Sequence, residues 1–214
     1  MKYPGYVKNI LAIVFSLVGS VSQAQNEPVF FFEQFLHAKI HFKNRSVTIV
    51  PMNYDAANDK MYFKRDGQLM ELVNLTTVDS VVWGKKVCFP YTNHGFLEKV
   101  KLTHGTVFIQ WLVKNVNVGY RGALGSITQA KVDRVYSAGS RGSQHADVYQ
   151  LKNNNNYYIM PEDSFKEVTT LKQLLKQFPH HTTAIETFVK EHNIQMQQPH
   201  SMLELLDYCL SLQP

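Results

Sequence analysis

The sequence predicts an α+β protein in which an antiparallel β-meander is followed by a segment of three helices. Between about residues 38 and 160, short apolar stretches alternate with turn-forming residues at roughly ten-residue spacing, which is typical of a barrel-like or sandwich-like body. Between about residues 162 and 213, apolar residues recur at helical spacing instead. Because the connections in the first part are too short for parallel crossovers, the strands are expected to be antiparallel.

The β-rich part is divided into hairpins by its turn residues. Turn-forming groups separate neighbouring apolar stretches at four places: Asn44-Arg45, Arg65-Asp66-Gly67, Gly84-Lys85 and His104-Gly105. The asparagines at 153–156 predict one more hairpin, because asparagine tolerates left-handed turn geometry. Residues 115–146 are polar and glycine-rich and predict a long loop with one short strand near 132–136. The expected strands cover residues 38–42, 47–52, 61–63, 69–73, 78–83, 87–91, 96–102, 106–113, 147–151 and 157–160.

Three candidate helix starts follow in the C-terminal part. Each is a capping box, in which a serine or threonine accepts from the backbone amide three residues on and a glutamate reaches back. The boxes pair Ser164 with Glu167, Thr183 with Glu186, and Ser201 with Glu204. A proline stands shortly before each box and separates neighbouring helices. We expect the helices to share one apolar core built from Phe165, Leu175, Phe178, Ile185, Phe188, Leu203 and Leu206.

The first 24 residues have the three parts of a secretory signal peptide. Lys2 and Lys8 supply the positive start, residues 10–18 are mostly apolar, and Ser22-Gln23-Ala24 fits the small-residue cleavage pattern. The apolar stretch is too short to span a bilayer, which takes about 20 residues. The sequence therefore predicts a signal peptide at 1–24, a β-rich body at 25–160, and a helical annex at 161–214 packed on the body as one unit.

The composition favours an exported protein without nucleic-acid contacts. Cleavage after Ala24 removes two lysines and no acids, so the formal charge falls from +5 to +3. The basic residues look scattered along the chain, whereas nucleic-acid binding usually needs them clustered. Cys88 and Cys209 have apolar neighbours and are expected to be buried and unbridged. No stretch after the signal is apolar enough to cross a membrane, so we expect a periplasmic or extracellular protein.

Two short motifs carry a resemblance. Asn53-Tyr54-Asp55 lies early in the β-rich part, and residues 171–179 combine leucine, lysine, phenylalanine and proline near the C-terminus. Together with the signal peptide, this layout resembles a diffuse group of uncharacterised exported proteins of Gram-negative bacteria. The resemblance covers most of the mature chain. It implies export and a β-rich fold with a C-terminal helical segment, and it brings no activity or functional residue with it.

The candidate ligand site lies in the glycine-rich residues 119–125. Tyr120 and Arg121 are its candidate ligand-binding residues, because an arginine and a tyrosine among glycines can contact an anion or a sugar. The stretch lacks the lysine-serine pair of a P-loop, and no strong helix pattern follows it, so neither that motif nor the dinucleotide fingerprint is met. The alternative interpretation is a flexible connection or a bend with close backbone packing.

No metal site is expected. His37 and His41 stand four residues apart, but the alternation around them favours a strand, which spreads the pair, and no glutamate lies between them. Asp55, Asn58 and Asp59 supply oxygens in one loop, but their spacing does not match an EF-hand. Asx turns explain these side chains without an ion.

The catalytic motifs are equally weak. There is no GxSxG, and residues 139–147 gather serine, histidine and aspartate in one loop, whereas triads are assembled from distant segments. We therefore expect a non-enzymatic binding, adaptor or assembly module without a cofactor, whose partner is an envelope protein or a small ligand. The alternative is a small exported hydrolase. A deep pocket with buried titratable side chains would favour the hydrolase, and an exposed strand edge or flat apolar patch would favour the module.

We expect the mature protein to begin at Gln25 and to be recovered outside the cytoplasm, because the signal features stand in the order that export requires. N-terminal sequencing of the exported form checks this. Recovery of an intact Met1 form from the soluble cytoplasm would contradict it.

Overall fold

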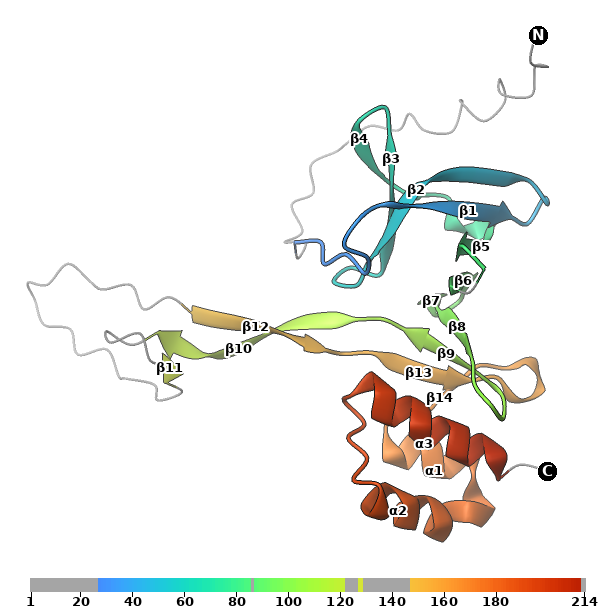
Figure 1. Cartoon of the computed structure of the whole chain (residues 1–214), viewed down its shortest axis with the longest axis vertical. Helices are drawn as coiled ribbons and strands as arrows, with labels where there is room; N and C mark the ends of the chain where they lie inside the picture. The colour runs from blue at the N-terminus through green and yellow to red at the C-terminus, as the bar shows by residue number, and fades with distance from the viewer. Residues whose placement is uncertain (1–26, 86, 122–126, 129–146, 213–214) are drawn as a thin grey trace, which may run out of the picture.

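The computed structural model describes residues 27–85, 87–121, 127–128 and 147–212 (Figure 1). The expected signal peptide and the short strand expected near 132–136 lie outside these residues. The helices are α1 Leu171–Gln177, α2 Thr182–Glu191 and α3 Pro199–Ser211. None of the helices in the described ranges is long and apolar enough to cross a membrane. The strands are β1 Leu36–Phe42, β2 Val47–Asp55, β3 Lys60–Arg65, β4 Gln68–Glu71, β5 Val78–Trp83, β6 Val87–Thr92, β7 Gly95–Phe96, β8 Glu98–Lys101, β9 Thr106–Gln110, β10 Val113–Arg121, β11 Ile127–Thr128, β12 Asp147–Asn153, β13 Asn156–Ile159 and β14 Lys166–Glu167.

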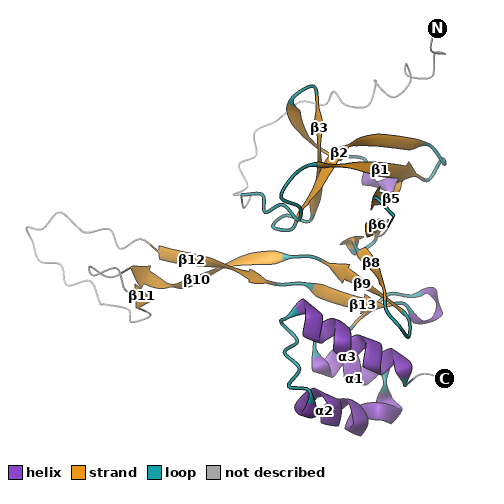
Figure 2. Ribbon diagram, in the orientation of Figure 1, coloured by secondary structure: helices purple, strands orange, loops and turns teal. Residues whose placement is uncertain are grey.

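The strands form antiparallel sheets, as the sequence predicts (Figure 2). One sheet has the order β4-β3-β2-β1-β5-β6-β7 and curls into a half-barrel. A second has the order β14-β13-β9-β8, and β11, β10 and β12 make a third. The helices pack on the second sheet. The predicted α+β class with a C-terminal helical segment is therefore confirmed, with a half-barrel in place of a closed barrel or a sandwich.

The four hairpin turns marked by turn residues in the sequence are present. They join β1 to β2, β3 to β4, β5 to β6 and β8 to β9. In the β3–β4 turn, Asp66 and Gly67 both have positive φ, at 52° and 78°. This geometry gives a two-residue turn a twist that matches its flanking strands, and it favours Asp-Gly.

The half-barrel encloses an aromatic core. Phe31 belongs to an N-terminal segment that the strand pattern does not reveal, and its amide donates to the Tyr54 carbonyl at 2.8 Å. The Phe31 ring packs against Phe89 and Trp111, with ring centroids 5.9 and 5.4 Å apart. Trp111 also borders the core beneath the helices. The N-terminal segment therefore packs against the aromatic core of the half-barrel.

A second core lies between the β9–β13 face and the helices. The prediction that Phe178, Ile185 and Leu206 are buried is confirmed. Phe165 lies elsewhere, packed with Leu97, Phe108 and Tyr158 in a separate small cluster. The three other predicted members are only partly buried: Leu175, Phe188 and Leu203. The core is thus shared with the sheet, because short helices need a larger apolar surface to pack against.

The helix starts predicted from capping boxes are wrong. Residues 166–167 pair with β13 as β14, so Ser164 precedes no helix. The box that caps α1 is Thr170 with Gln173, whose side chains and backbone amides bond reciprocally. Thr183 and Ser201 lie inside α2 and α3, whose N-caps make no side-chain hydrogen bond. Tertiary pairing and the prolines, rather than serine caps, set these boundaries.

The long loop predicted from residue 115 and the hairpin predicted at 153–156 are also wrong where the chain is described. β10 pairs with β12 from Val113↔Asn153 to Tyr120↔Asp147. β13 pairs with β9 instead, so the asparagine run passes from one strand into the next without reversing. Asn155 Oδ1 accepts from the Leu112 amide at 2.9 Å and spans the gap between the two ladders.

The cysteines are free, as predicted. Cys209 is buried, and burial raises the pKa of its thiol to about 12. Cys88 is only partly buried on β6, which corrects the expectation of full burial. Burial still raises the pKa of the Cys88 thiol.

One polar cluster joins the half-barrel to the four-stranded sheet. Asp59, in the β2–β3 turn, accepts from Tyr54 Oη and from Gln110 Nε2, each at 2.8 Å. Gln110 on β9 also donates to the His94 carbonyl at 2.8 Å and accepts from Asn156 Nδ2 at 2.9 Å. We call these five residues the junction cluster. It ties together four segments that are distant in sequence.

We expect Gly95→Ala to lower the free energy of unfolding by about 3 kcal/mol. Gly95 has φ +90°, and a Cβ there would overlap Asp59 Oδ2, so the variant adds backbone strain and disturbs a buried hydrogen bond. The matched control is Gly67→Ala, at φ +78° with open space around it, which should lose only about 1 kcal/mol. Chemical denaturation measures both. Equal losses would contradict the role given to the close approach.

Candidate functional site

The β10–β12 ribbon projects from the body as a two-stranded arm (Figure 1). Its root is continuous with the four-stranded sheet, because β10 follows β9 along the chain and β12 leads into β13. Among the described strands, only β11 pairs with an outer edge of the ribbon, at the far end of β10. The ribbon therefore presents open strand edges, which are templates for contact with another chain.

Two lysines face each other near the root of the ribbon. Lys114 on β10 lies directly opposite Lys152 on β12. Residues in this relation project from the same face, with Cβ atoms about 5 Å apart, and like charges there destabilise the pair of strands. Both residues are exposed, and neither forms an ion pair with a carboxylate of the described residues.

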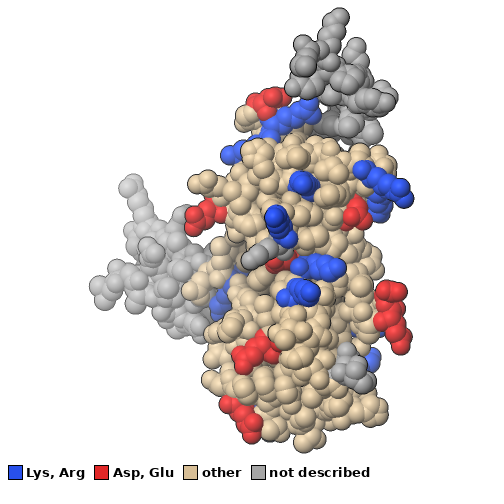
Figure 3. Space-filling view, turned by 45° about the vertical axis from the view of Figure 1, so that its right-hand side comes forward, with Lys and Arg blue, Asp and Glu red and all other residues tan. Residues whose placement is uncertain are grey.

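The charge is unevenly distributed along the sequence. Residues 113–153 contain six lysines and arginines but two aspartates, whereas residues 154–214 contain four lysines and seven acids. Figure 3 shows basic side chains gathered at mid-height of the face in view, with acidic ones around its margins. Leu151 is 51% exposed, but it projects from the opposite face of β12 to Lys152. The face of the ribbon root that carries the lysine pair is therefore basic.

The predicted ligand residues Tyr120 and Arg121 lie at the far end of β10. Their backbones pair with Thr128 and Ile127 of β11, and Tyr120 also pairs with Asp147 of β12. They therefore belong to a strand, which corrects the expectation of a loop. Residues 122–125 of that predicted loop lie outside the described residues.

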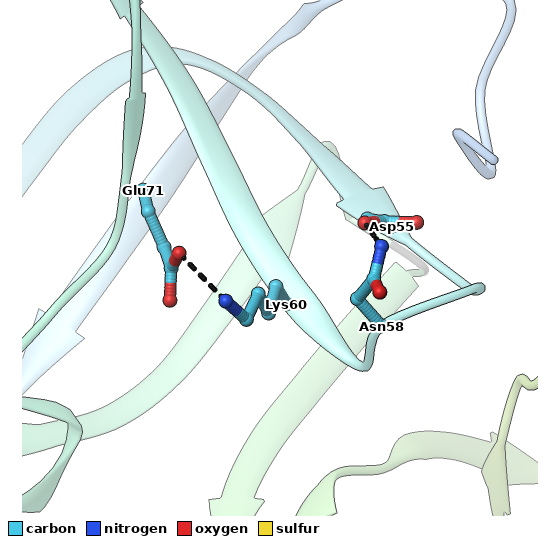
Figure 4. Close-up of polar contacts among 4 residues, drawn as sticks. All are labelled: Asp55, Asn58, Lys60 and Glu71. Atoms are coloured by element: carbon cyan, nitrogen blue, oxygen red, sulfur yellow. Dashed lines mark hydrogen bonds and ion pairs between the residues drawn. The ribbon is translucent and has the colours of Figure 1, made fainter. Parts of the chain in front are cut away.

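Both carboxylate oxygens of Asp55 are engaged within the chain, one of them by the side-chain amide of Asn58 (Figure 4). Asp55 Oδ1 accepts from the amides of Val29 at 2.9 Å and Ala57 at 3.0 Å, and Asp55 Oδ2 accepts from Asn58 Nδ2 at 2.6 Å. The Ala57 contact is the predicted Asx turn. Asp59, the third residue of this candidate set, belongs to the junction cluster instead.

Two carboxylates are withdrawn from solvent near the junction. Burial raises the pKa of Asp59, and hydrogen bonds from Tyr54 and Gln110 offset this only in part. Burial also raises the pKa of Glu98, whose Oε2 accepts from Trp111 Nε1 at 2.6 Å. Burial and the adjacent Asp59 charge raise the pKa of Tyr54 well above its usual range. These side chains are held by protein partners, so we assign them a structural role.

The histidines are dispersed. His37 and His41 lie on β1, in the strand predicted for them. His192 stacks on Phe188 with 4.0 Å between ring centroids, and its Nδ1 lies 3.1 Å from Glu204 Oε1. In the described ranges, no group of three or more His, Cys, Asp or Glu side chains is placed to hold a metal ion.

Two cavities border the described residues. One of about 330 Å³ lies at the tip of the β8–β9 hairpin, and Lys99 and His104 stand on its rim. The other, of about 200 Å³, lies beside Trp111 and Asn155. Neither is lined by an aspartate or glutamate. The serine and histidine considered for a hydrolase at 139–146 lie outside the described residues, and Asp147 begins β12.

Sequence patterns locate Tyr120 and Arg121 but miss the lysine pair. Lys114 and Lys152 become neighbours only through the register of β10 on β12, and no local signal in the sequence gives that register. Comparison with protein families, curated proteins and solved structures finds no match to the chain.

We expect Asp59→Asn to gain stability relative to the unsubstituted protein as the pH rises. The pKa of Asp59 is raised by burial, so its protonated form stabilises the fold. That contribution is fully present below the unfolded pKa of about 3.9 and is lost as the pH rises through the folded pKa. Asparagine stays neutral and can still accept from Gln110. Chemical denaturation of both proteins across this pH range measures the difference.

The matched control for this titration is Asp66→Asn, at a side chain that is 92% exposed. It should show no comparable dependence on pH. If the advantage of Asp59→Asn shrank as the pH rose, Asp59 would be stabilised in its ionised form, and the assignment would be wrong.

Proposed function

We propose that this chain is exported and acts as a non-enzymatic binding or assembly module in the periplasm or outside the cell. It holds an acidic surface of a partner protein against the β10–β12 ribbon. The lysine pair at the root of the ribbon makes the first contact. This extends the function expected from the sequence to a particular surface and a particular kind of partner.

The observation that carries the proposal is the placement of Lys114 opposite Lys152. An arrangement that weakens the free ribbon becomes favourable when a carboxylate of a partner lies between the two ammonium groups. The open edges of the ribbon add backbone donors and acceptors beside this contact.

Tyr120 and Arg121 are further candidate contacts for the partner in this proposal. They lie on the strand that carries Lys114, seven residues or fewer along the chain. An arginine can grip a carboxylate through two parallel hydrogen bonds, which gives direction as well as charge. Arg121 would therefore orient the partner that the lysine pair attracts.

The cavities support a binding role over a hydrolase. The ionisable side chains that line the 330 Å³ cavity, Lys99 and His104, are exposed. The partly buried carboxylates of Asp59 and Glu98 accept hydrogen bonds from protein side chains. A hydrolytic site usually combines a pocket with titratable side chains directed into it.

We expect the double variant Lys114→Gln, Lys152→Gln to bind poly-L-glutamate about tenfold more weakly than the unsubstituted chain, because each exposed charge contributes up to about 1 kcal/mol. Titration calorimetry at low salt measures the affinity. The matched control is Lys172→Gln, Lys176→Gln, two exposed lysines on α1, which should leave the affinity nearly unchanged.

A single charge reversal separates binding from folding. Lys152→Glu places opposite charges across the ribbon, so it should raise the free energy of unfolding by about 0.5 kcal/mol while it weakens poly-L-glutamate binding. Stability and binding then change in opposite directions. Unchanged binding in both ribbon variants would exclude the lysine pair as the contact surface.

A further inference from the structure

The function proposed for the ribbon does not involve the cavity at the tip of the β8–β9 hairpin. Its wall is formed by the hairpin on one side and by α3 and the end of β13 on the other. Figure 1 shows the hairpin tip beside the C-terminal half of α3. The His104 amide in the hairpin turn donates to Asp207 Oδ1 on α3 at 2.9 Å. This hydrogen bond links the two sides of the cavity.

Apolar side chains line one part of this cavity, and polar groups of the hairpin line the rest. Phe108 and Ile159 are buried at 5% and 3% exposure, and Leu210 reaches toward Gly105 from α3. Met160 lies at the rim with 43% of its surface exposed. A volume of about 330 Å³ is at the lower end of the range for small-molecule sites. The cavity therefore has room for a short apolar chain or a single ring.

The charge at the rim is positive. His104 Nδ1 lies 3.3 Å from Asp207 Oδ1, so that histidine already has an acidic partner. Burial acts to raise the pKa of Asp207, but hydrogen bonds from His104 and Thr103 outweigh it and leave the pKa below its usual value. Lys99 forms no ion pair with a carboxylate of the described residues. Its ammonium is the free charge at the mouth of an apolar cavity.

We propose that this cavity binds a free medium-chain carboxylic acid, with the alkyl chain on Phe108, Met160 and Leu210 and the carboxylate at Lys99. Apolar atoms on the floor and a single cation at the rim complement a ligand with one apolar end and one anionic end. The site lies on the β8–β9 hairpin, apart from the lysine pair of the ribbon. The test of this site is therefore independent of the test of the function proposed above.

Decanoate is the probe, with decanol as its uncharged counterpart. Calorimetry on the purified chain should give saturable binding of decanoate that is about fivefold tighter than that of decanol, the factor expected from an exposed charge pair. The amide resonances of Gly105 and Thr106, which line the cavity, should shift during the titration. Absence of decanoate binding, or shifts confined to other residues, would overturn the proposal.

Two variants assign the contacts. Lys99→Gln should remove the fivefold preference for decanoate and leave decanol binding unchanged, whereas Lys101→Gln, an exposed lysine on the same strand outside the cavity, should change neither. Met160→Asp places a like charge at the rim and should weaken decanoate more than decanol. Equal effects of Lys99→Gln and Lys101→Gln would mean that the rim charge plays no part, and the proposal would fail.

Discussion

The contact between the Asp59 carboxylate and the Gln110 amide holds the two sheets of this protein in one arrangement. The chain passes from the half-barrel into the four-stranded sheet between β7 and β8, and Tyr54 Oη donates to the Trp111 carbonyl at 2.9 Å beside the junction. Gln110 bonds to Asp59 in the β2–β3 turn and to the His94 carbonyl in the β6–β7 turn, while Asn156 donates to it from β13. The Asp59 carboxylate is partly buried, and its pKa is raised. A group that is unfavourable to bury is therefore kept where each of its oxygens has a donor, and this fixes the relative position of the two cores.

Local patterns in the sequence were sufficient for the fold class and for four of the five predicted hairpins, because a turn such as Asp66-Gly67 determines its own geometry. Local patterns gave wrong predictions where pairing between strands that are distant in sequence determines the structure. Ser164 begins a good capping pattern, but residues 166–167 form a strand that pairs with β13 instead of a helix. The asparagine run is equally suited to a reversal and to a break in a ladder, and only the β9–β13 and β10–β12 pairings distinguish them. The sequence does not reveal the lysine pair for the same reason, since Lys114 and Lys152 stand 38 residues apart.

The two proposed binding surfaces differ in the kind of ligand that each one suits. The ribbon offers charge and open backbone, which suits an extended acidic surface, whereas the hairpin cavity offers an apolar floor with one cation, which suits a small amphiphile. Both lie on elements that extend from the four-stranded sheet, and the helices cover the face of that sheet between them. The half-barrel contributes to neither surface directly. Its contribution is to anchor the sheet through the junction cluster, so that both surfaces stand on a rigid base.

The continuity of the ribbon with the sheet has a mechanical consequence. Tension applied at the far end of the ribbon passes along β10 into β9 and along β12 into β13. Those strands are bonded on their outer sides to β8 and β14, so a lengthwise pull loads several hydrogen bonds at once in shear. A sideways load meets less resistance, because between the two ladders only the Leu112 carbonyl, bonded to the Asn154 amide at 2.8 Å, and the Leu112 amide, bonded to Asn155 Oδ1 at 2.9 Å, join the described strands. The arm is therefore stiffer along its length than across it.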